Sequence, residues 1–397
     1  MSKFEKLIKE LCPNGVERKK IKEEYIRLRG TPITAGKMKE IENSNGDIKI
    51  FAGGKTVINA FEKDIPNANI TRVPAVLVQS RGVIDAVYYD KPFTFKNEMW
   101  AYTAENVVSV KYLYYVLKNN MDYFRSAASG MGSLPQISLG VTEDFQIPVP
   151  PIPVQEEIVR ILDSFTELTA ELTAELTARK KQYEYYRDKL LAPYQNIPMI
   201  ELGSVCEFVR GPFGGALKKE IFQPKGYAVY EQQHAIYRSL DFRYYIDEAK
   251  FIELKRFAVN SGDMIVSCSG TIGKTFVIPD NAPKGIINQA LLKITPREGL
   301  NVFYLQYFFE STISKILNEV SRGGAIKNVP SVGELKAIKI PLPPLDVQKH
   351  LVHVLDNFDS ICSDLKIGLP AEIEARTKQY EYYRDKLLTF KETPTYE

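Results

Sequence analysis

The sequence predicts an α/β (α+β) protein with a pseudo-twofold internal repeat, in which two globular domains are joined by two long helices that form an antiparallel coiled coil. Three observations lead to this fold. Thirteen residues, RKKQYEYYRDKLL at 179–191, return as RTKQYEYYRDKLL at 376–388 with one difference. A proline-rich segment and a long helical pattern accompany each copy. The stretches between them carry the short apolar runs of mixed α and β structure.

The duplication extends well beyond these thirteen residues. QIPVPPIPVQEEIVRILDSF (146–165) matches KIPLPPLDVQKHLVHVLDNF (339–358) at an offset of 193, whereas the tyrosine motif is offset by 197. The second copy has therefore gained four residues, about one helical turn, which is the insertion that changes the helix face least. A fainter match relates residues 17–32 to 198–213. The predicted order is a globular unit, a proline-rich hinge and a long helix, repeated once.

The first long helix is predicted to run from about Pro153 to Leu191. No glycine or proline interrupts this stretch after Pro153, and the first turn contains two glutamates, which suit a helix N-terminus. Residues 166–179 repeat the unit TAEL, a strong helix former that adds length in near-whole turns. Apolar residues every three, four or seven positions form a narrow seam: Ile158, Ile161, Phe165, Leu168, Leu172, Leu176, Tyr183, Tyr186 and Leu190.

The second long helix carries a similar seam but should be interrupted. Its IGLPAEIE insert is predicted to kink or break the helix near Gly368 and Pro370. Two seams in one chain are predicted to bury each other as an antiparallel pair, because the domain between them brings the chain back. The second seam comprises Leu351, Val354, Leu355, Phe358, Ile361, Leu365, Ile373, Tyr380, Tyr383 and Leu387.

Each globular unit is predicted to contain a strand, a glycine turn and a second strand. RVPAVLVQSRGVIDAVYY (72–89) and GDMIVSCSGTIGKTFVI (262–278) show this pattern and are rich in valine and isoleucine. Residues 110–126 and 302–320 are predicted to form one helix in each unit.

Length and composition exclude several classes of protein. A chain of 397 residues is too long for one core, and 44% hydrophobic with 25% charged residues indicates a soluble globular protein. No apolar run approaches the roughly 20 residues of a membrane span, and the amino terminus lacks a signal-peptide core. The four cysteines are scattered, which fits a reducing cytoplasm. The net charge of +3 permits nucleic-acid binding without requiring it.

Catalytic and metal-binding motifs are missing, so the chain is predicted to be non-catalytic and to hold no cofactor or metal. The P-loop pattern around Lys274 lacks its first glycine, because that position is Cys268, and GGKT at 53–56 fails in the same way. No Asn/Asp-Pro-Pro-Tyr/Phe pocket for a flipped base is present. His350 and His353 lie one helical turn apart, but no third ligand is evident.

Glycine–polar runs at matched places in the two units are candidates for nucleic-acid contact. Their Arg, Lys, Gln, Ser and Asn side chains suit phosphate oxygens and base edges, although each run could also be a solvated turn. The candidates are Gln79, Arg81, Lys96 and Ser133 in the first unit and Lys274, Gln289, Lys327 and Asn328 in the second.

The repeated KQYEYYRDKLL motif is a candidate docking surface for two copies of one partner. Packing explains the seam tyrosines, but it would not by itself keep the polar residues identical in both copies. The candidates for docking are Gln182, Arg187 and Lys189 in the first copy and Gln379, Arg384 and Lys386 in the second.

These features together resemble the specificity (S) subunits of type I restriction-modification systems. The resemblance covers essentially the whole chain and depends on the paired IPVPPIPVQEEIVRILD and IPLPPLDVQKHLVHVLD segments, the paired tyrosine motifs, and GDMIVSCSGTIGK with GIINQAL. The TAEL tract marks one branch of that family. Each element is weak alone, but the combination is specific.

The resemblance implies that the two domains each recognise one half of a bipartite, asymmetric site on double-stranded DNA. It implies docking of two modification subunits, which bind S-adenosylmethionine and methylate a flipped adenine, and association with restriction subunits that use ATP and magnesium. The KFEKLIKEL segment would partly replace a helix missing before the first domain. The implied division is residues 1–16 (N-terminal helix), 17–150 and 193–343 (target-recognition domains), and 151–192 and 344–390 (conserved helices).

The alternative from the residues is a two-domain adaptor whose domains bind proteins. Retention on DNA that weakens with salt would separate the two functions, because phosphate contacts require that dependence. A stand-alone enzyme is nearly excluded by the missing motifs.

Overall fold

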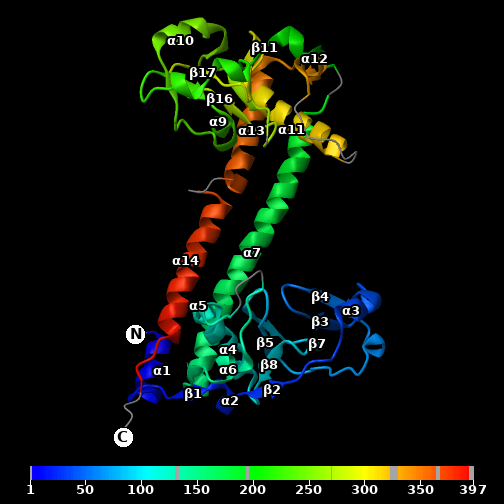
Figure 1. Cartoon of the computed structure of the whole chain (residues 1–397), viewed down its shortest axis with the longest axis vertical. Coiled ribbons are helices and arrows are strands. Elements are labelled where there is room, and N and C mark those ends of the chain that lie inside the picture. Colours follow the sequence, from blue (N-terminus) through cyan, green and yellow to red (C-terminus); the bar gives the residue numbers. More distant parts are fainter. Residues whose placement is uncertain are drawn as a thin grey trace. The chain divides into compact units, whose positions relative to one another are not determined.

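The computed structural model describes residues 2–129, 134–193, 196–269, 271–321, 330–363 and 367–392. The chain divides into two compact units (Figure 1). Unit 1 comprises Met1–Thr173 and Glu372–Glu397, and unit 2 comprises Ala174–Ala371. Each unit contains one globular domain and parts of the long helices.

The described strands of unit 1 form three sheets. They are β1 (Arg18–Lys20), β2 (Ile26–Leu28), β3 (Ile48–Phe51), β4 (Val57–Ala60), β5 (Ala75–Gln79), β6 (Asp85–Tyr89), β7 (Phe93–Phe95), β8 (Trp100–Thr103) and β9 (Gln146–Pro148). The largest sheet is antiparallel in the order β2-β8-β5-β6. A second sheet has the order β4-β3-β7, with β3 and β7 parallel. Strands β1 and β9 pair where the chain enters and leaves the domain.

Strand β5 is buried on both faces, which explains its unbroken apolar run. On one face, Val76 and Val78 pack with Tyr102 against helix α4 (Val107–Asn119). On the other face, Leu77 packs in a cluster that includes Phe95 of the three-stranded sheet. The remaining helices of the domain are α1 (Lys3–Leu11), α2 (Ile21–Glu24), α3 (Ala35–Ile41), η1 (Glu62–Asp64), α5 (Met121–Ser126) and α6 (Leu139–Glu143).

Unit 2 repeats this topology. Its main strands are β10 (Met199–Glu201), β11 (Cys206–Arg210), β12 (Tyr227–Tyr230), β13 (Tyr245–Ile246), β14 (Ala258–Val259), β15 (Met264–Ser267), β16 (Thr275–Val277), β17 (Gly285–Ile287), β18 (Leu291–Pro296) and β19 (Lys339–Pro341). The antiparallel sheet β11-β18-β15-β16 corresponds strand by strand to β2-β8-β5-β6. The second sheet, β13-β12-β17-β14, also contains one parallel pair, and β10 pairs with β19 as β1 pairs with β9.

The helices of the second domain follow the same plan. They are α8 (Leu202–Val205), η2 (Gly214–Ala216), η3 (Lys219–Ile221), α9 (Gln232–Tyr237), α10 (Glu248–Glu253), η4 (Lys255–Phe257), α11 (Val302–Ser321) and α12 (Val332–Ala337). Helix α11 covers the sheet as α4 does in unit 1. The two predicted strand–turn–strand segments and the predicted helix in each domain are confirmed, although the first predicted helix is divided into α4 and α5.

Helix α7 (Ile152–Leu190) is 39 residues long, as the uninterrupted apolar seam predicted. Its first turn is locked to the proline hinge, because the Gln155 amide donates to the Pro150 carbonyl oxygen over 2.8 Å. In unit 2, Gln348 makes the same bond to Pro343, also over 2.8 Å, at the start of α13 (Leu345–Ser363). These buried glutamines explain why the glutamine–proline spacing recurs in both hinges.

The second long helix is interrupted where the insert predicted it. Helix α13 ends at Ser363, Ile367 and Gly368 are non-helical, and α14 (Leu369–Leu388) begins one residue before Pro370. Proline is tolerated in a first turn because its missing N–H has no intrahelical partner there.

The long helices pair in opposite directions within each unit, so the antiparallel pairing is confirmed. In unit 1, Phe165 of α7 stacks on Tyr383 of α14 with ring centroids 5.5 Å apart. Ile161, one turn earlier, and Leu387, one turn later, line the same pocket as this pair. In unit 2, Phe358 of α13 stacks on Tyr186 of α7 at 6.1 Å, which is the reciprocal pair of the internal repeat.

Helix α1 is attached to α7 by an almost fully buried carboxylate. Lys3 Nζ donates to Glu157 Oε2 over 2.8 Å, and Arg160 donates to both oxygens of the same carboxylate. The side chain of Glu157 is only 2% exposed. The hydrogen bonds from Arg160 and Lys3 lower the pKa of Glu157 to about 2.

We expect Glu157→Gln to lower the free energy of unfolding by about 1–3 kcal/mol at pH 7, because bonds to a buried charge are lost. An unfolded glutamate has a pKa of roughly 4.3. Since the folded pKa is lower, the stabilisation is complete above about pH 4.5 and disappears as the pH falls toward 2. Urea unfolding between pH 3 and pH 7 should therefore show a flatter pH profile for Glu157→Gln. The exposed neighbour Glu156 supplies the control, and an equal effect of Glu156→Gln would contradict the assignment.

Candidate nucleic-acid interface

Several turns of unit 1 meet at one end of the four-stranded sheet, where β2 and β5 end and β6 and β8 begin. The Gly54 amide donates to the Arg81 carbonyl oxygen over 3.0 Å, and the Thr31 amide donates to the Phe95 carbonyl oxygen over 2.7 Å. These bonds hold the turns against one another. We call the set the loop end of unit 1: residues 29–31, 52–56, 80–84 and 96–99.

The four candidates predicted in this unit have different surroundings. Arg81 is exposed, and its guanidinium makes no hydrogen bond or ion pair with the described residues. Lys96 is partly buried and pairs with Glu98 over 2.9 Å. Gln79 does not lie at the surface as predicted: it ends β5 and is only 6% exposed, because β5 is covered on both faces. Ser133 lies outside the described residues.

The carboxylate of Glu98 modifies the charge of this surface. Burial alone would raise its pKa, but hydrogen bonds from Lys96 and the Gly53 amide lower it overall. Glu98 therefore remains ionised and offsets the charge of Lys96. The positive charge of Arg81 is balanced less than that of Lys96. Its guanidinium is therefore suited to bind a phosphate group or the edge of a guanine base.

The corresponding end of the sheet in unit 2 carries a similar set of turns. The Cys268 amide donates to the Ala290 carbonyl oxygen over 2.9 Å, and Ser269 Oγ donates to Gln232 Oε1 over 2.7 Å. Lys274 and Gln289 are exposed here, and their side chains make no hydrogen bond with the described residues. Lys327 and Asn328 lie outside the described residues. We call residues 210–213, 268–269, 271–274 and 288–290 the loop end of unit 2.

Lys55 is a cationic residue of the loop end of unit 1 that the sequence analysis missed. It is exposed and follows Gly54, whose φ of +74° belongs to the left-handed region that glycine tolerates best. A Cβ placed on Gly82 would lie 3.5 Å from Gly54, so the two turns touch. The sequence signal that could have indicated Lys55 is the glycine pair of GGKT. This segment does not match a P-loop, but its glycines form a tight turn that places the lysine beside Arg81.

The repeated tyrosine motif forms a second matched surface, on which the two predicted docking arginines are only partly exposed. The side chains of Arg187 and Arg384 are each 22% exposed, and their guanidinium groups lie 5.6 and 5.7 Å from the ring centroids of Tyr183 and Tyr380. Each also pairs with the aspartate that follows it. Contacts inside the chain therefore account for the identity of these arginines, which we had expected to be exposed.

The other four docking candidates are exposed in the structure. Gln182 and Gln379 each accept a hydrogen bond from the arginine three residues earlier, and Lys189 and Lys386 point from later turns of the same helices. Between them, Tyr185 and Tyr382 are each 62% exposed and were missed by the sequence analysis. In each helix, the glutamine, the tyrosine and the lysine lie at positions i, i+3 and i+7, so the three side chains share one helix face. We call them the matched helix faces: Gln182, Tyr185 and Lys189, and Gln379, Tyr382 and Lys386.

The class of protein follows from these sites: a two-domain binding protein with equivalent loop surfaces on equivalent scaffolds. None of the helices in the described part of the chain has the length and hydropathy of a membrane span. The family model for the type I restriction modification DNA specificity domain matches residues 19–179 and again residues 195–375. The chain therefore belongs to the family of type I restriction-modification specificity subunits.

Individual relatives agree with this assignment. The chain is 32% identical over 364 residues to the specificity subunit of the type I restriction enzyme EcoR124I/EcoR124II from Escherichia coli, covering 88% of both chains. It is 34% identical over 313 residues to the putative type I restriction enzyme specificity subunit S.HindORF215P of Haemophilus influenzae, covering 75% of this chain and 77% of the relative. The crystal structure of the S subunit from M. genitalium has the same fold, with a TM-score of 0.56 at 16% identity, over 94% of this chain and 96% of that one.

Proposed function

We propose that each domain of this chain recognises one half of a bipartite, asymmetric DNA site. The observation that supports this proposal is that two copies of one scaffold carry different side chains at corresponding loop positions. Lys96 in unit 1 corresponds to Asn288 in unit 2, because their amides donate to the carbonyl oxygens of Phe51 and Tyr230, the last residues of the equivalent strands β3 and β12. A lysine suits guanine or phosphate, whereas an asparagine amide suits adenine, so the two halves should differ in sequence.

The chemistry of modification and cleavage is assigned to partners. In this proposal two modification subunits, which bind S-adenosylmethionine and methylate adenine, dock on the matched helix faces. Restriction subunits that use ATP and magnesium join the same assembly, and the specificity chain itself supplies no catalytic step. The two faces support this stoichiometry because they present the same three residue types at the same spacing in both units.

Mapping methylated adenines in a genome that expresses this chain with its modification subunit tests the proposed function. We expect one motif with two dissimilar halves of fixed sequence, separated by a spacer of fixed length whose sequence is not recognised. A continuous or symmetric motif would contradict the proposal that the two domains recognise different DNA sequences. An adaptor that binds proteins instead would give no motif, and the purified chain would show no DNA retention that weakens with salt.

We expect the double variant Tyr185→Ala, Tyr382→Ala to lose the assembly of one specificity chain with two modification subunits. Tyrosine is enriched among the few interface residues that carry most of the binding energy, and truncating such an anchor costs about 2 kcal/mol or more. Each single variant should retain one modification subunit, which native mass spectrometry would count. Tyr237→Ala is the control, because Tyr237 is exposed but has no matched counterpart on the helix faces. An unchanged 1:2 complex in the double variant, with normal thermal unfolding, would show that the partner docks elsewhere.

A further inference from the structure

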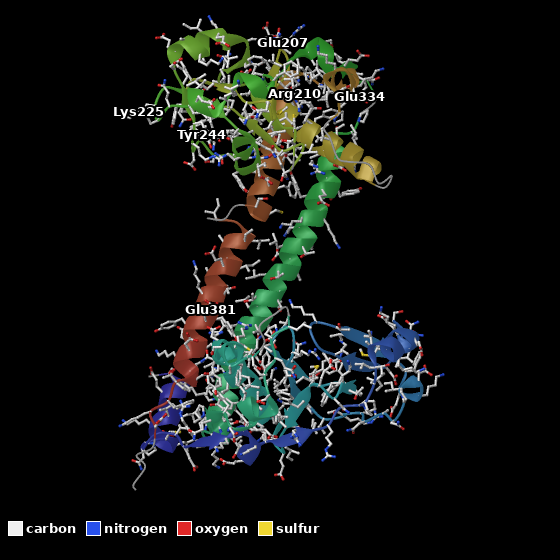
Figure 2. All side chains as sticks on the ribbon, in the orientation of Figure 1. Glu207, Arg210, Lys225, Tyr244, Glu334 and Glu381 are labelled. Carbon is white, nitrogen blue, oxygen red and sulfur yellow. The ribbon has the colours of Figure 1, made fainter. Side chains whose placement is uncertain are left out.

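An arginine–glycine pair occupies the same structural position in both domains. Arg29 and Gly30 follow β2, and Arg210 and Gly211 stand at the end of β11 (Figure 2 labels Arg210). Arg210 pairs with Leu292 in the β11–β18 ladder, and extending the β2–β8 ladder by one residue places Arg29 opposite Trp100. Both arginines therefore stand where the edge strand enters the loop end of its unit.

The glycines explain how these positions are fixed. A Cβ on Gly30 would collide with the carbonyl oxygen of Phe95, and a Cβ on Gly211 would collide with that of Asn288. Only glycine allows the backbone to approach so closely. Because Phe95 and Asn288 immediately precede Lys96 and Gln289, each arginine is held beside a predicted contact residue of its own domain.

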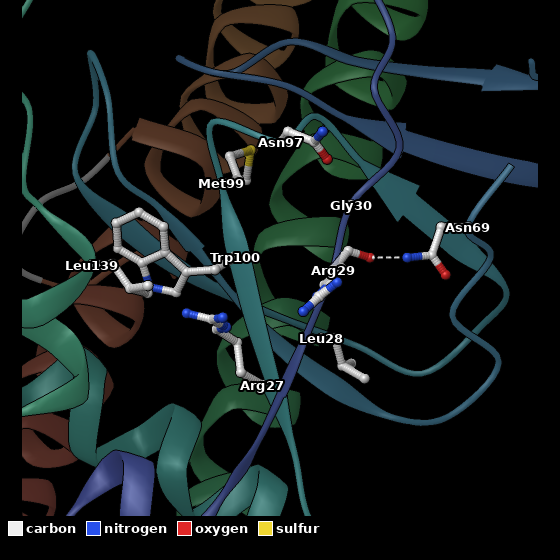
Figure 3. A pocket seen from close by; sticks show the side chains of 9 residues that line it. All are labelled: Arg27, Leu28, Arg29, Gly30, Asn69, Asn97, Met99, Trp100 and Leu139. Atoms are coloured by element: carbon white, nitrogen blue, oxygen red, sulfur yellow. Dashed lines mark hydrogen bonds between the residues drawn. The ribbon is translucent and has the colours of Figure 1, made fainter. Parts of the chain in front are cut away.

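Neither arginine side chain has a polar partner among the residues that the structure describes. The guanidinium groups of Arg29 and Arg210 are exposed and make no hydrogen bond or ion pair with the described residues. By contrast, Arg27, two residues earlier on the same strand face, pairs with Glu143 over 3.0 Å. Arg29 lines a pocket of 330 Å³ together with Asn69, Asn97 and Trp100 (Figure 3). The Asn69 amide donates to the Arg29 carbonyl oxygen over 2.8 Å and so fixes the backbone below that side chain.

The neighbouring positions differ between the domains, whereas the arginine is the same. Lys96 corresponds to Asn288, and Arg27 corresponds to Phe208. Residues that recognise bases should differ between domains that recognise different sequences. A residue that is identical, unpaired and fixed on the same scaffold fits a contact that does not depend on sequence, and backbone phosphates are that kind of contact.

We propose that Arg29 and Arg210 each bind a DNA backbone phosphate, one in each half of the site, and thereby set the register of the domain on the duplex. This inference is built on the proposed DNA-binding function and adds two residues to it. A guanidinium matches phosphate oxygens with two donors at once, and the rigid glycine turn places it without loss of loop entropy.

The test measures binding of the full chain to two duplexes, one carrying the mapped site and one with that site scrambled, across a range of salt concentrations. Arg29→Ala and Arg210→Ala should each weaken binding about tenfold on both duplexes. Each should also reduce the magnitude of the slope of log K against log salt by about 0.9, and the double variant by about twice that. Arg29→Lys should keep most of the slope, because it keeps the charge.

Arg297→Ala is the matched control, since Arg297 follows β18 at the opposite end of the same sheet and lies 3.8 Å from Glu207. Its slope should equal that of the wild type. Unchanged slopes for both alanine variants, with normal thermal unfolding, would overturn the phosphate assignment, as would a loss confined to the duplex that carries the site. A wild-type chain that binds neither duplex would instead overturn the proposed function itself.

Discussion

Exchanging residues 17–150 for the corresponding domain of another family member should change one half of the recognised site completely and leave the other half unchanged. The physical reason is that the domain enters and leaves through one strand pair. Arg18 of β1 lies opposite Pro148 of β9, and the Val149 amide donates to the Glu17 carbonyl oxygen, so both junctions of the exchange lie next to the same short ladder. The start of α7 is preserved as well, because the Gln155 amide bonds to the backbone carbonyl oxygen at position 150, which the last residue of any donor domain supplies.

The donor domain must also rebuild the contacts between α4 and the retained segment. Tyr115 donates to Asp163 of the retained α7 over 2.5 Å, whereas the bond of 3.0 Å from Tyr112 to the Pro148 carbonyl oxygen lies within the exchanged domain. In unit 2 the same roles belong to Tyr304, on Pro341, and Tyr307, on Asp356. Because both domains of this chain use the same two tyrosines, a donor that carries them should be accepted without repacking.

Adenine methylation mapping would read the outcome of this exchange directly. The reciprocal exchange of the second domain is the control, and it should alter only the other half. If both halves change together in either hybrid, then the two domains do not recognise DNA independently. A hybrid that folds but methylates nothing, with a donor whose own site is known, would also contradict the modular arrangement.

The helices and the paired strands could be predicted from sequence because their signals are local. A seam that recurs every three or four residues specifies a helix whatever it packs against, and the internal repeat showed which segments correspond. The parallel pairs β3–β7 and β12–β17 were not predicted, because they join segments more than forty residues apart and leave no short-range pattern.

The individual site residues were harder to predict, because exposure is set by tertiary packing. Gln79 has a polar side chain at the end of a strand, yet β5 is covered on both faces and buries it. Arg187 and Arg384 were expected to be free, yet each lies on a tyrosine of its own helix. The arginine–glycine pairs were visible in the faint match of residues 17–32 with 198–213. Only the register of the sheets showed that they stand at equivalent positions beside the loop ends.

Inserting one more TAEL unit after Leu176 should keep both halves of the recognised site and lengthen the unread spacer between them. Four residues extend a helix by about 6 Å and turn it by roughly 40° beyond one full rotation. One base pair advances about 3.4 Å along the duplex. A helix parallel to the DNA would therefore shift the far domain by just under two base pairs. Because helix tilt and the proline hinges absorb part of this shift, we expect one base pair, and two at most.

The structure explains why α7 should tolerate this change. The tract is helical throughout, and its leucines 168, 172 and 176 are half-buried while the residues between them are mostly exposed. A further TAEL unit continues that stripe with little rotation. The second long helix is not continuous, because Ile367 and Gly368 are non-helical and α14 begins at Leu369.

Three variants make the test specific to helix length. Deleting Thr173–Leu176 should shorten the spacer by the amount that the insertion lengthens it. Inserting only two residues after Leu176 turns the following seam by roughly 200°, so Tyr183 and Tyr186 would face away from α13 and methylation should be lost. Leu172→Ala keeps the length and should leave the spacer unchanged. If methylation mapping gives the same spacer for the wild type, the insertion and the deletion, then the length of α7 does not set the distance between the two halves of the site.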